Sequence, residues 1–188
     1  MDHFYESVEG WFCETDKKIY DDAVDKFTDG DVFVEIGSWK GRSASAMAVN
    51  IVNSNKAIKF FCVDTWKGSE EHQEGQVFAD VDVIGGSLLD RFLENTKPVE
   101  NHIQIIRKES TVAANDFEDH SLAFVYIDAS HDYESVKKDL NAWYPKVKKG
   151  GILAGHDWGW VPVKNAVANF CANNGLTVTG DTSWKIQL

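Results

Sequence analysis

Apolar residues follow two different spacings along the chain, and these spacings predict alternating strands and helices. Five short runs rich in Val, Ile and Phe have no polar face, which is typical of strands covered on both sides in a parallel sheet. The expected strands are Val32–Ile36, Lys59–Asp64, Ile103–Arg107, Leu122–Asp128 and Gly151–Gly155. Helical spacing recurs between or after them, in Arg42–Val52, Ser87–Asn95, Thr111–Phe117, Tyr133–Tyr144 and Val163–Asn173. This order predicts an α/β fold with helices on both faces of the sheet.

The two ends of the chain add a helix and a hairpin to this pattern. Apolar residues at helical spacing in Trp11–Phe27, followed by Asp29-Gly30, predict an N-terminal helical segment within residues 1–30. Residues 176–187 predict two antiparallel strands joined by a short loop that contains glycine. The chain has 188 residues and shows no internal repeat or linker, so we expect a single domain spanning 1–188.

Composition narrows the range of partners. The net charge of −11 argues against nucleic acid, because phosphate contacts need clustered Lys and Arg and the basic residues here are scattered. No apolar run approaches the ~20 residues needed to cross a bilayer, and the N-terminus has no signal-peptide pattern. We therefore expect a cytoplasmic protein without membrane association. The three cysteines, Cys13, Cys62 and Cys171, are too far apart to indicate a zinc motif or a disulfide framework.

The turn after the first strand carries the most specific pattern, Glu35-Ile36-Gly37-Ser38-Trp39-Lys40-Gly41. Gly37 allows a sharp turn and a close approach of ligand to backbone, and Gly41 lets the next helix begin near the strand. A Walker loop would need Gly-Lys-Ser/Thr, and the dinucleotide fingerprint would need a glycine where Trp39 stands. Either an ordinary tight turn or a loop that binds a polar ligand at the helix start is consistent with this segment.

The spacing E-x-G-x-x-x-G resembles the first motif of class I S-adenosylmethionine-dependent methyltransferases. In that family the acidic residue and the glycine loop lie near the methionine part of the cofactor. The resemblance therefore implies that the methionine part is bound by Glu35, Gly37, Ser38, Gly41 and Ser43. The C-terminal hairpin is also similar to the family's Rossmann-like seven-stranded sheet, which is mostly parallel and closes with an antiparallel pair. A dinucleotide-binding domain would close with another parallel strand.

Two further segments are cofactor candidates. Asp64 ends the second strand, where a carboxylate can accept hydrogen bonds from a ribose diol or can cap its own loop. Trp66, two residues later, could stack on the adenine or shelter the loop. Ser110 follows the third strand and could donate a hydrogen bond to the adenine ring or cap a helix.

The densest group of polar residues follows the fourth and fifth strands. Asp128 and His131 come after one strand, and His156 and Asp157 after the other. Because parallel strands end at the same edge of a sheet, we expect these four side chains to share a cleft. The segments Asp-x-x-His-x-Tyr, Lys-Lys-Gly-Gly and Gly-His-Asp are similar to the small methyltransferases that act on macrolide sugars and rhamnose.

That resemblance implies Asp128 and Asp157 as ligands of a divalent metal such as Mg²⁺, with His156 as an uncertain third. Mg²⁺ prefers oxygen ligands, so an imidazole in this place departs from the relatives' pattern. We expect Asp128, His131 and His156 to be the catalytic residues, with Asp128 close to the cofactor. His131 could instead cap the following helix or form a hydrogen bond with Asp128. Without a metal, His131 or His156 would take the acceptor's proton, with a pKa near ~6.5.

The acceptor is not evident from the sequence, but its size is constrained. The turn-rich segment 67–85 carries apolar residues and is expected to form a lid, or else a contact in a homo-oligomer. No large accessory domain is present, so a small acceptor such as a sugar hydroxyl is favoured. Two alternatives stay open: a nucleotide-binding oxidoreductase and a non-catalytic cofactor-binding protein.

Overall fold

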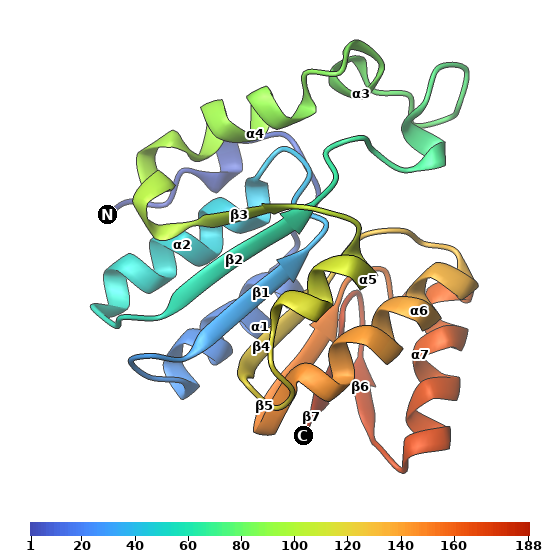
Figure 1. Cartoon of the computed structure of the whole chain (residues 1–188). Helices are drawn as coiled ribbons and strands as arrows, with labels where there is room; N and C mark the ends of the chain where they lie inside the picture. Colours follow the sequence, from blue (N-terminus) through green and yellow to red (C-terminus); the bar gives the residue numbers. More distant parts are fainter.

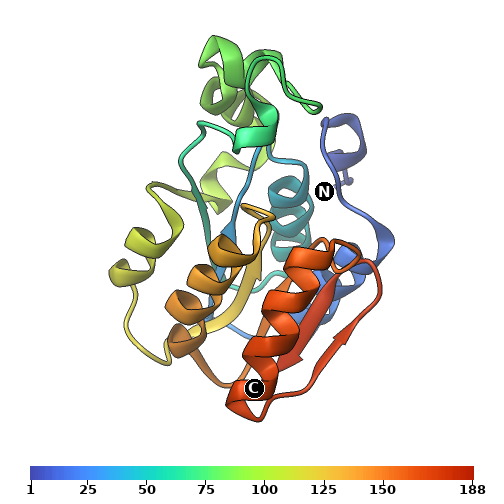
Figure 2. The ribbon, with the colours of Figure 1, turned by 90° about the vertical axis from the view of Figure 1, so that its right-hand side faces the viewer.

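The computed structural model describes all 188 residues, with a central sheet between two layers of helices (Figures 1 and 2). The seven strands are β1 (Val32–Ile36), β2 (Lys59–Asp64), β3 (Gln104–Arg107), β4 (Leu122–Ile127), β5 (Val147–Gly155), β6 (Val178–Gly180) and β7 (Trp184–Gln187). Their order across the sheet is β3-β2-β1-β4-β5-β7-β6. Strands β1 to β5 are parallel, and β7 runs antiparallel to both β5 and β6. The predicted mostly parallel sheet with its C-terminal antiparallel pair is therefore confirmed.

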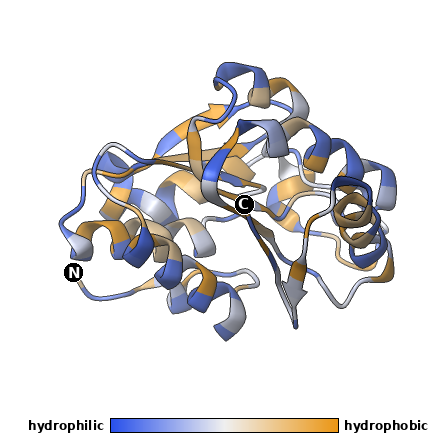
Figure 3. Cartoon of the chain, turned by 90° about the horizontal axis from the view of Figure 1, so that it is seen from below, coloured by the Kyte–Doolittle hydropathy of each residue, from blue (hydrophilic) through white to orange (hydrophobic).

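Helices cover both faces of the sheet. On one face lie α1 (Glu14–Lys26), α2 (Arg42–Ser54) and α4 (Leu88–Thr96), and on the other lie α5 (Ser110–Ala113), α6 (Tyr133–Trp143) and α7 (Val161–Asn174). A short helix, α3 (Val81–Gly85), belongs to the segment between β2 and α4. The 3-10 turns are Tyr5–Ser7, Glu70–His72, Lys97–His102, Ala114–Asp116 and Tyr144–Lys146. Figure 3 shows hydrophobic strands between helices whose outer faces are polar. The sheet thus separates two hydrophobic cores.

Most element boundaries lie within two residues of the expected ones, and three differences have a clear physical cause or change the type of element. The N-terminal helix begins at Glu14 rather than Trp11, because the Asp16 carboxylate accepts the N–H of Cys13 and caps the helix there. The expected helix 111–117 is one turn of α5 followed by a 3-10 turn. Strand β5 begins four residues early, at Val147, because Val147 pairs with Leu122 across a register shift.

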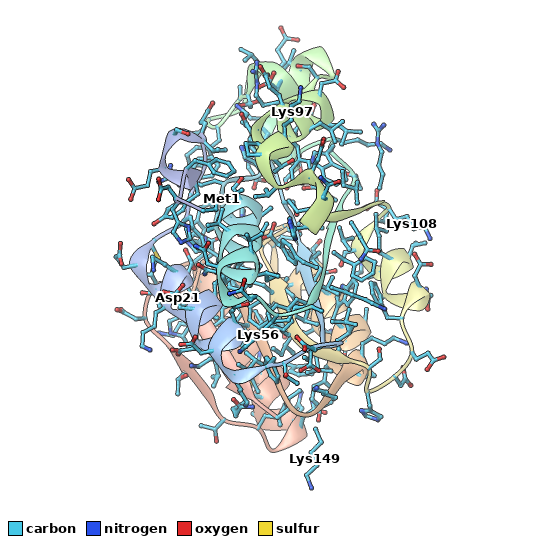
Figure 4. All side chains as sticks on the ribbon, turned by 90° about the vertical axis from the view of Figure 1, so that its left-hand side faces the viewer. Met1, Asp21, Lys56, Lys97, Lys108 and Lys149 are labelled. Atoms are coloured by element: carbon cyan, nitrogen blue, oxygen red, sulfur yellow. The ribbon has the colours of Figure 1, made fainter.

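Helix length and the placement of basic side chains describe the surface of the molecule. No helix combines the length and the hydrophobicity needed to span a bilayer. The basic side chains are dispersed, and Lys108 and Lys149 project from different parts of the surface (Figure 4). Lys108 is also neutralised by Asp116, at 2.6 Å.

The position of the glycine loop depends on Gly37. Its φ is +87°, and a Cβ added there would lie 1.9 Å from the carbonyl oxygen of Asp128. The loop after β1 therefore crosses the end of β4 at backbone contact distance. Gly41 has a different role, because a Cβ there would lie 2.7 Å from Thr96 and 3.1 Å from Phe92, where α2 packs on α4.

We predict that Gly37→Ala destabilises the protein by about 2–3 kcal/mol, because the loop would have to move off β4. The matched control is Gly30→Ala, whose φ of +84° imposes the same backbone strain but whose added Cβ would meet nothing within 4 Å. Urea unfolding measures both variants. Equal losses of stability would show that the crossing over Asp128 costs nothing beyond backbone strain.

Candidate active site

A cavity of about 650 Å³ lies where the parallel strands end. Its walls come from the loops after β1 to β5, from the N-terminal segment and from the segment between β2 and α4. The sequence-predicted residues that line it are Gly37, Ser38, Ser43, Asp64, Ser110, Asp128, His131, His156 and Asp157. Trp11, Phe78 and Trp160 also line the cavity, and these three side chains are partly exposed. The structure thus brings most of the predicted site residues into one cavity.

Asp64 holds the glycine loop in place. One carboxylate oxygen accepts the backbone N–H groups of Ser38 at 2.9 Å and Trp39 at 3.0 Å. The other accepts the N–H of Trp66 at 2.8 Å. Asp64 lines the cavity, so the carboxylate could also accept a hydrogen bond from a ligand. Both readings of Asp64, loop cap and ligand contact, are therefore compatible.

Three predicted cofactor residues do not line the cavity. Glu35 is 1% exposed and accepts the hydroxyl proton of Tyr20 at 2.7 Å, on the core side of β1. Burial raises the pKa of Glu35 to about 7. Gly41 faces α4, as described above. Trp66 is buried against Phe92, and its ring N–H donates to the carbonyl of Trp39, so it shelters the loop and does not stack on a ligand.

Ser110 is committed to partners within the protein. Its hydroxyl donates to Asp139 at 2.5 Å and accepts the ring N–H of Trp143 at 2.9 Å. It is the first residue of α5 and makes no capping bond. The helix-cap expectation for Ser110 is therefore wrong, whereas its contact with adenine stays a prediction, because Ser110 lines the cavity. Asp139 also lines this end of the cavity, and burial raises its pKa to about 6.

The four polar residues after β4 and β5 form one cluster. His131 Nε2 lies 2.9 Å from Asp157 Oδ2, and His156 Nδ1 lies 3.2 Å from the same oxygen. Asp128 Oδ1 lies 3.7 Å from His156 Nδ1. Asp157 has a φ of +58°, an uncommon conformation for a residue with a side chain, at the sharp turn that ends β5. This turn places its carboxylate between the two imidazoles.

The cluster changes the charge state that the sequence led us to expect. Burial lowers the pKa of both histidines, but the nearby carboxylates outweigh it and raise the pKa of His131 to about 9 and that of His156 to about 10. Burial also raises the pKa of Asp128 to about 7, whereas the two histidines hold the pKa of Asp157 well below its usual range. At neutral pH both histidines are imidazolium ions, so a histidine base with a pKa near 6.5 is wrong for this state.

The group of possible metal ligands in this cluster differs from the expected set in its third member. Ligand atoms of Asp128, Asp157 and His131 all lie within 4.8 Å of one another. His156, the expected third ligand, belongs instead to a group with Cys13 and Asp16. The sequence did not point to Asp16, because only the packing of α1 against the sheet brings it within 3.5 Å of His156.

A second residue missed from the sequence is Glu71. It lies in the 3-10 turn between β2 and α3, and its Oε1 atom is 2.8 Å from Nδ1 of His131. An acidic residue in an acidic, turn-rich segment gave no signal of this contact.

The three cysteines are free, as the sequence predicted.

Comparison with known proteins identifies the kind of domain. Residues 34–158, more than half of the chain, match the protein family described as "Methyltransferase domain". The chain belongs to this methyltransferase family. A related sequence, the uncharacterized protein y4gI of Sinorhizobium fredii (strain NBRC 101917 / NGR234), is 27% identical over 124 residues. That match covers 66% of the methyltransferase chain but only 13% of y4gI.

Solved structures share the fold. The O-methyltransferase NovP superposes with a TM-score of 0.70 at 18% identity, covering 91% of this methyltransferase and 78% of NovP. The calicheamicin methyltransferase CalS11 gives 0.64 at 17% identity, with 92% and 78% covered. Cofactor-bound Rv0187 from MTB gives 0.68 at 11% identity, with 97% and 85% covered. At these identities the structural similarity establishes the fold only. The substrate has to be inferred from the chemistry of the site.

We predict that the thermal stability of this methyltransferase falls as pH rises. The pKa values of His131 and His156 are raised in the folded state, so their contribution is fully present below the unfolded value of about 6.5. It is lost as pH rises through about 9 to 10. Melting temperatures measured between about pH 6.5 and about pH 10 test this prediction. The double variant His131→Gln/His156→Gln should show a shallower decline, and an equal slope in both proteins would contradict the assignment.

Proposed function

We propose that this methyltransferase transfers the methyl group of S-adenosylmethionine to a hydroxyl group of a small molecule such as a sugar. The observation that carries the proposal is the single cavity that joins the glycine loop and Asp64 to the cluster around Asp128. Membership of the methyltransferase family supports the reaction. The names of two fold relatives, the O-methyltransferase NovP and the TDP-rhamnose 3'-O-methyltransferase CalS11, support oxygen as the atom methylated and a sugar as acceptor.

S-adenosylmethionine fits the polar groups that the cavity offers. Ser38 is 2% exposed and lines the cavity, and its hydroxyl has no partner within the protein. It is available to the polar methionine part of the cofactor. Asp64 also lines the cavity and could accept a hydrogen bond from a ribose hydroxyl. When bound, the cofactor would supply a methyl group activated by its sulfonium.

The protein's main contribution to such a reaction is alignment. Methyl transfer from a sulfonium is an in-line displacement, so holding the acceptor oxygen opposite the methyl group supplies much of the rate. The partly exposed rings of Trp11, Phe78 and Trp160 line the cavity. Such aromatic faces suit the apolar C–H face of a sugar ring or a flat phenol. They support a small acceptor held at the entrance with its hydroxyl directed toward Asp128.

The acceptor hydroxyl must also lose a proton, and Asp128 is the group placed to take it. Asp128 follows β4 in the cavity wall, beside the glycine loop. Its pKa of about 7 suits a base that works near neutral pH. The imidazolium ions of His131 and His156 lie beside it and would stabilise the negative charge that develops on the acceptor oxygen. This assigns the base role to a carboxylate instead of to a histidine.

The same cluster offers a donor set for a divalent cation. Asp128, Asp157 and His131 would hold it, because two carboxylates and one imidazole converge within 4.8 Å. His131 would have to lose its proton to act as a ligand, so a cation and the imidazolium form of His131 exclude one another. An imidazole suits Mn²⁺ or Zn²⁺ better than Mg²⁺. A cation there would lower the pKa of an acceptor hydroxyl.

We predict that S-adenosylhomocysteine raises the melting temperature and that NAD does not. At a ligand concentration about 100 times Kd, binding adds about 2.7 kcal/mol to the stability of the folded state. A thermal-shift panel with both ligands provides the measurement. Stabilisation by NAD without any effect of S-adenosylhomocysteine would favour the oxidoreductase alternative.

We predict that Asp128→Asn lowers kcat at least about 100-fold, because an amide cannot take the acceptor proton. Affinity for S-adenosylhomocysteine, measured by calorimetry, should stay within twofold. Glu134→Gln, an exposed acid of α6, is the control and should behave as wild type. Transfer from methyl-labelled S-adenosylmethionine to a panel of sugars and phenols gives the rates. Full turnover by Asp128→Asn would remove Asp128 from the mechanism.

Repeating the wild-type assay with EDTA tests the cation. Loss of transfer that is restored by Mn²⁺ or Mg²⁺ would assign a metal to the Asp128–Asp157–His131 group. Unchanged methyl transfer in EDTA would show that no cation is needed, and Asp128 would then take the proton of the acceptor hydroxyl without a metal.

A further inference from the structure

We propose that Glu71 is a positioning residue that holds the imidazole ring of His131 in the active site. The inference rests on the proposed function, because it concerns the same catalytic cluster. Glu71 lies 60 positions before His131, on the segment that joins β2 to α4. In Figure 1 this segment, with α3, stands beyond the ends of the strands and above the loops that follow them. The proposal gives the expected lid a chemical role.

The ring of His131 is held at both nitrogens by carboxylates from different elements. Nδ1 lies 2.8 Å from Glu71 Oε1, and Nε2 lies 2.9 Å from Asp157 Oδ2. The ring centroid also lies 4.9 Å from that of Trp160. His131 itself stands in the irregular loop between β4 and α6. Glu71 and Asp157 together therefore define the plane and direction of the ring.

The segment that carries Glu71 contacts the glycine loop through an ion-pair group and through a pair of packed rings. Lys40, inside that loop and 2% exposed, pairs with Asp80 at 2.7 Å and with Asp82 at 3.4 Å. The ring of His72, next to Glu71, packs on Trp39 at a centroid distance of 4.2 Å. A buried lysine is costly to separate from its partners, so these contacts keep the segment against the loop. The segment that joins β2 to α4 therefore contacts the glycine loop through Asp80, Asp82 and His72, and it contacts His131 through Glu71.

A simple surface ion pair is the alternative to a positioning role. The Glu71 side chain is 30% exposed, and exposed ion pairs contribute little to stability. If Glu71 were only such a pair, its removal would leave His131 in place. If it positions the ring, its removal frees Nδ1 and lets the ring turn away from the cleft. Loss of a carboxylate that orients a functional histidine typically costs about 10- to 100-fold in activity.

The first experiment observes the ring directly and needs neither cofactor nor acceptor. In protein labelled with ¹⁵N-histidine, an Nδ1–H held by a carboxylate exchanges slowly with water and gives its own proton signal, which His131→Gln assigns by its loss. Glu71→Ala should remove this signal. Glu71→Gln should keep it, because the amide oxygen still accepts a hydrogen bond. Glu70→Gln, the neighbouring acid, is the matched control. A signal that persists in Glu71→Ala overturns the proposal.

The second experiment measures catalysis with the acceptor that supports wild-type transfer in the sugar and phenol panel. Glu71→Ala should lower kcat about 10- to 100-fold, with the KM for S-adenosylmethionine and the affinity for S-adenosylhomocysteine within twofold of wild type. Glu71→Gln should recover most of this loss. Unchanged kcat in Glu71→Ala overturns the positioning role. If the wild type neither binds S-adenosylhomocysteine nor transfers methyl groups, the proposed function fails, whereas the ring signal still decides whether Glu71 holds His131.

Discussion

The close crossing of the Gly37 loop over the end of β4 is the constraint on which the site depends. The two backbones approach so closely that a side chain at position 37 would occupy the space of the Asp128 carbonyl. This crossing sets the loop that begins α2 directly beside the residue that begins the polar cluster. Asp64 then fixes the same loop from β2 by accepting two of its N–H groups. Three neighbouring strands thus bring the Gly37 loop, Asp64 and Asp128 to one cavity.

The second organising feature is the balance of charge around two histidines. Four carboxylates, those of Asp16, Glu71, Asp128 and Asp157, lie within 4 Å of one or both imidazoles. Each imidazole is therefore more stable as a cation, and the cluster keeps its protons to an unusually high pH. A chain with a net charge of −11 thus holds two imidazolium ions among carboxylates at the ends of β4 and β5.

Buried hydrogen bonds connect this cluster to the N-terminal helix. Asp16 of α1 accepts the hydroxyl protons of Tyr126 in β4 and Ser183 before β7, and it faces His156. Four residues along the helix, Tyr20 donates to Glu35 of β1. Buried polar groups must find partners, so these contacts fix how α1 sits on the sheet. The helix is consequently part of the support of the site, although it contributes no residue to the cavity wall.

The sequence by itself determined the fold class, the approximate strand positions and the polar residues at the ends of the strands, because these follow from local patterns. Apolar runs specify strands, glycines specify the turn at 37, and parallel strands end at one edge, so Asp64, Asp128 and Asp157 had to meet there. Only the tertiary structure decided which of these groups touch. Three predicted cofactor residues form hydrogen bonds within the protein, namely Trp66, Glu35 and Ser110. Two carboxylates from distant segments contact the histidines, namely Glu71 and Asp16. Such contacts depend on how a helix and a covering segment pack over the sheet. The charge state followed in turn, since a pKa is set by the neighbours in space and not by the neighbours in sequence.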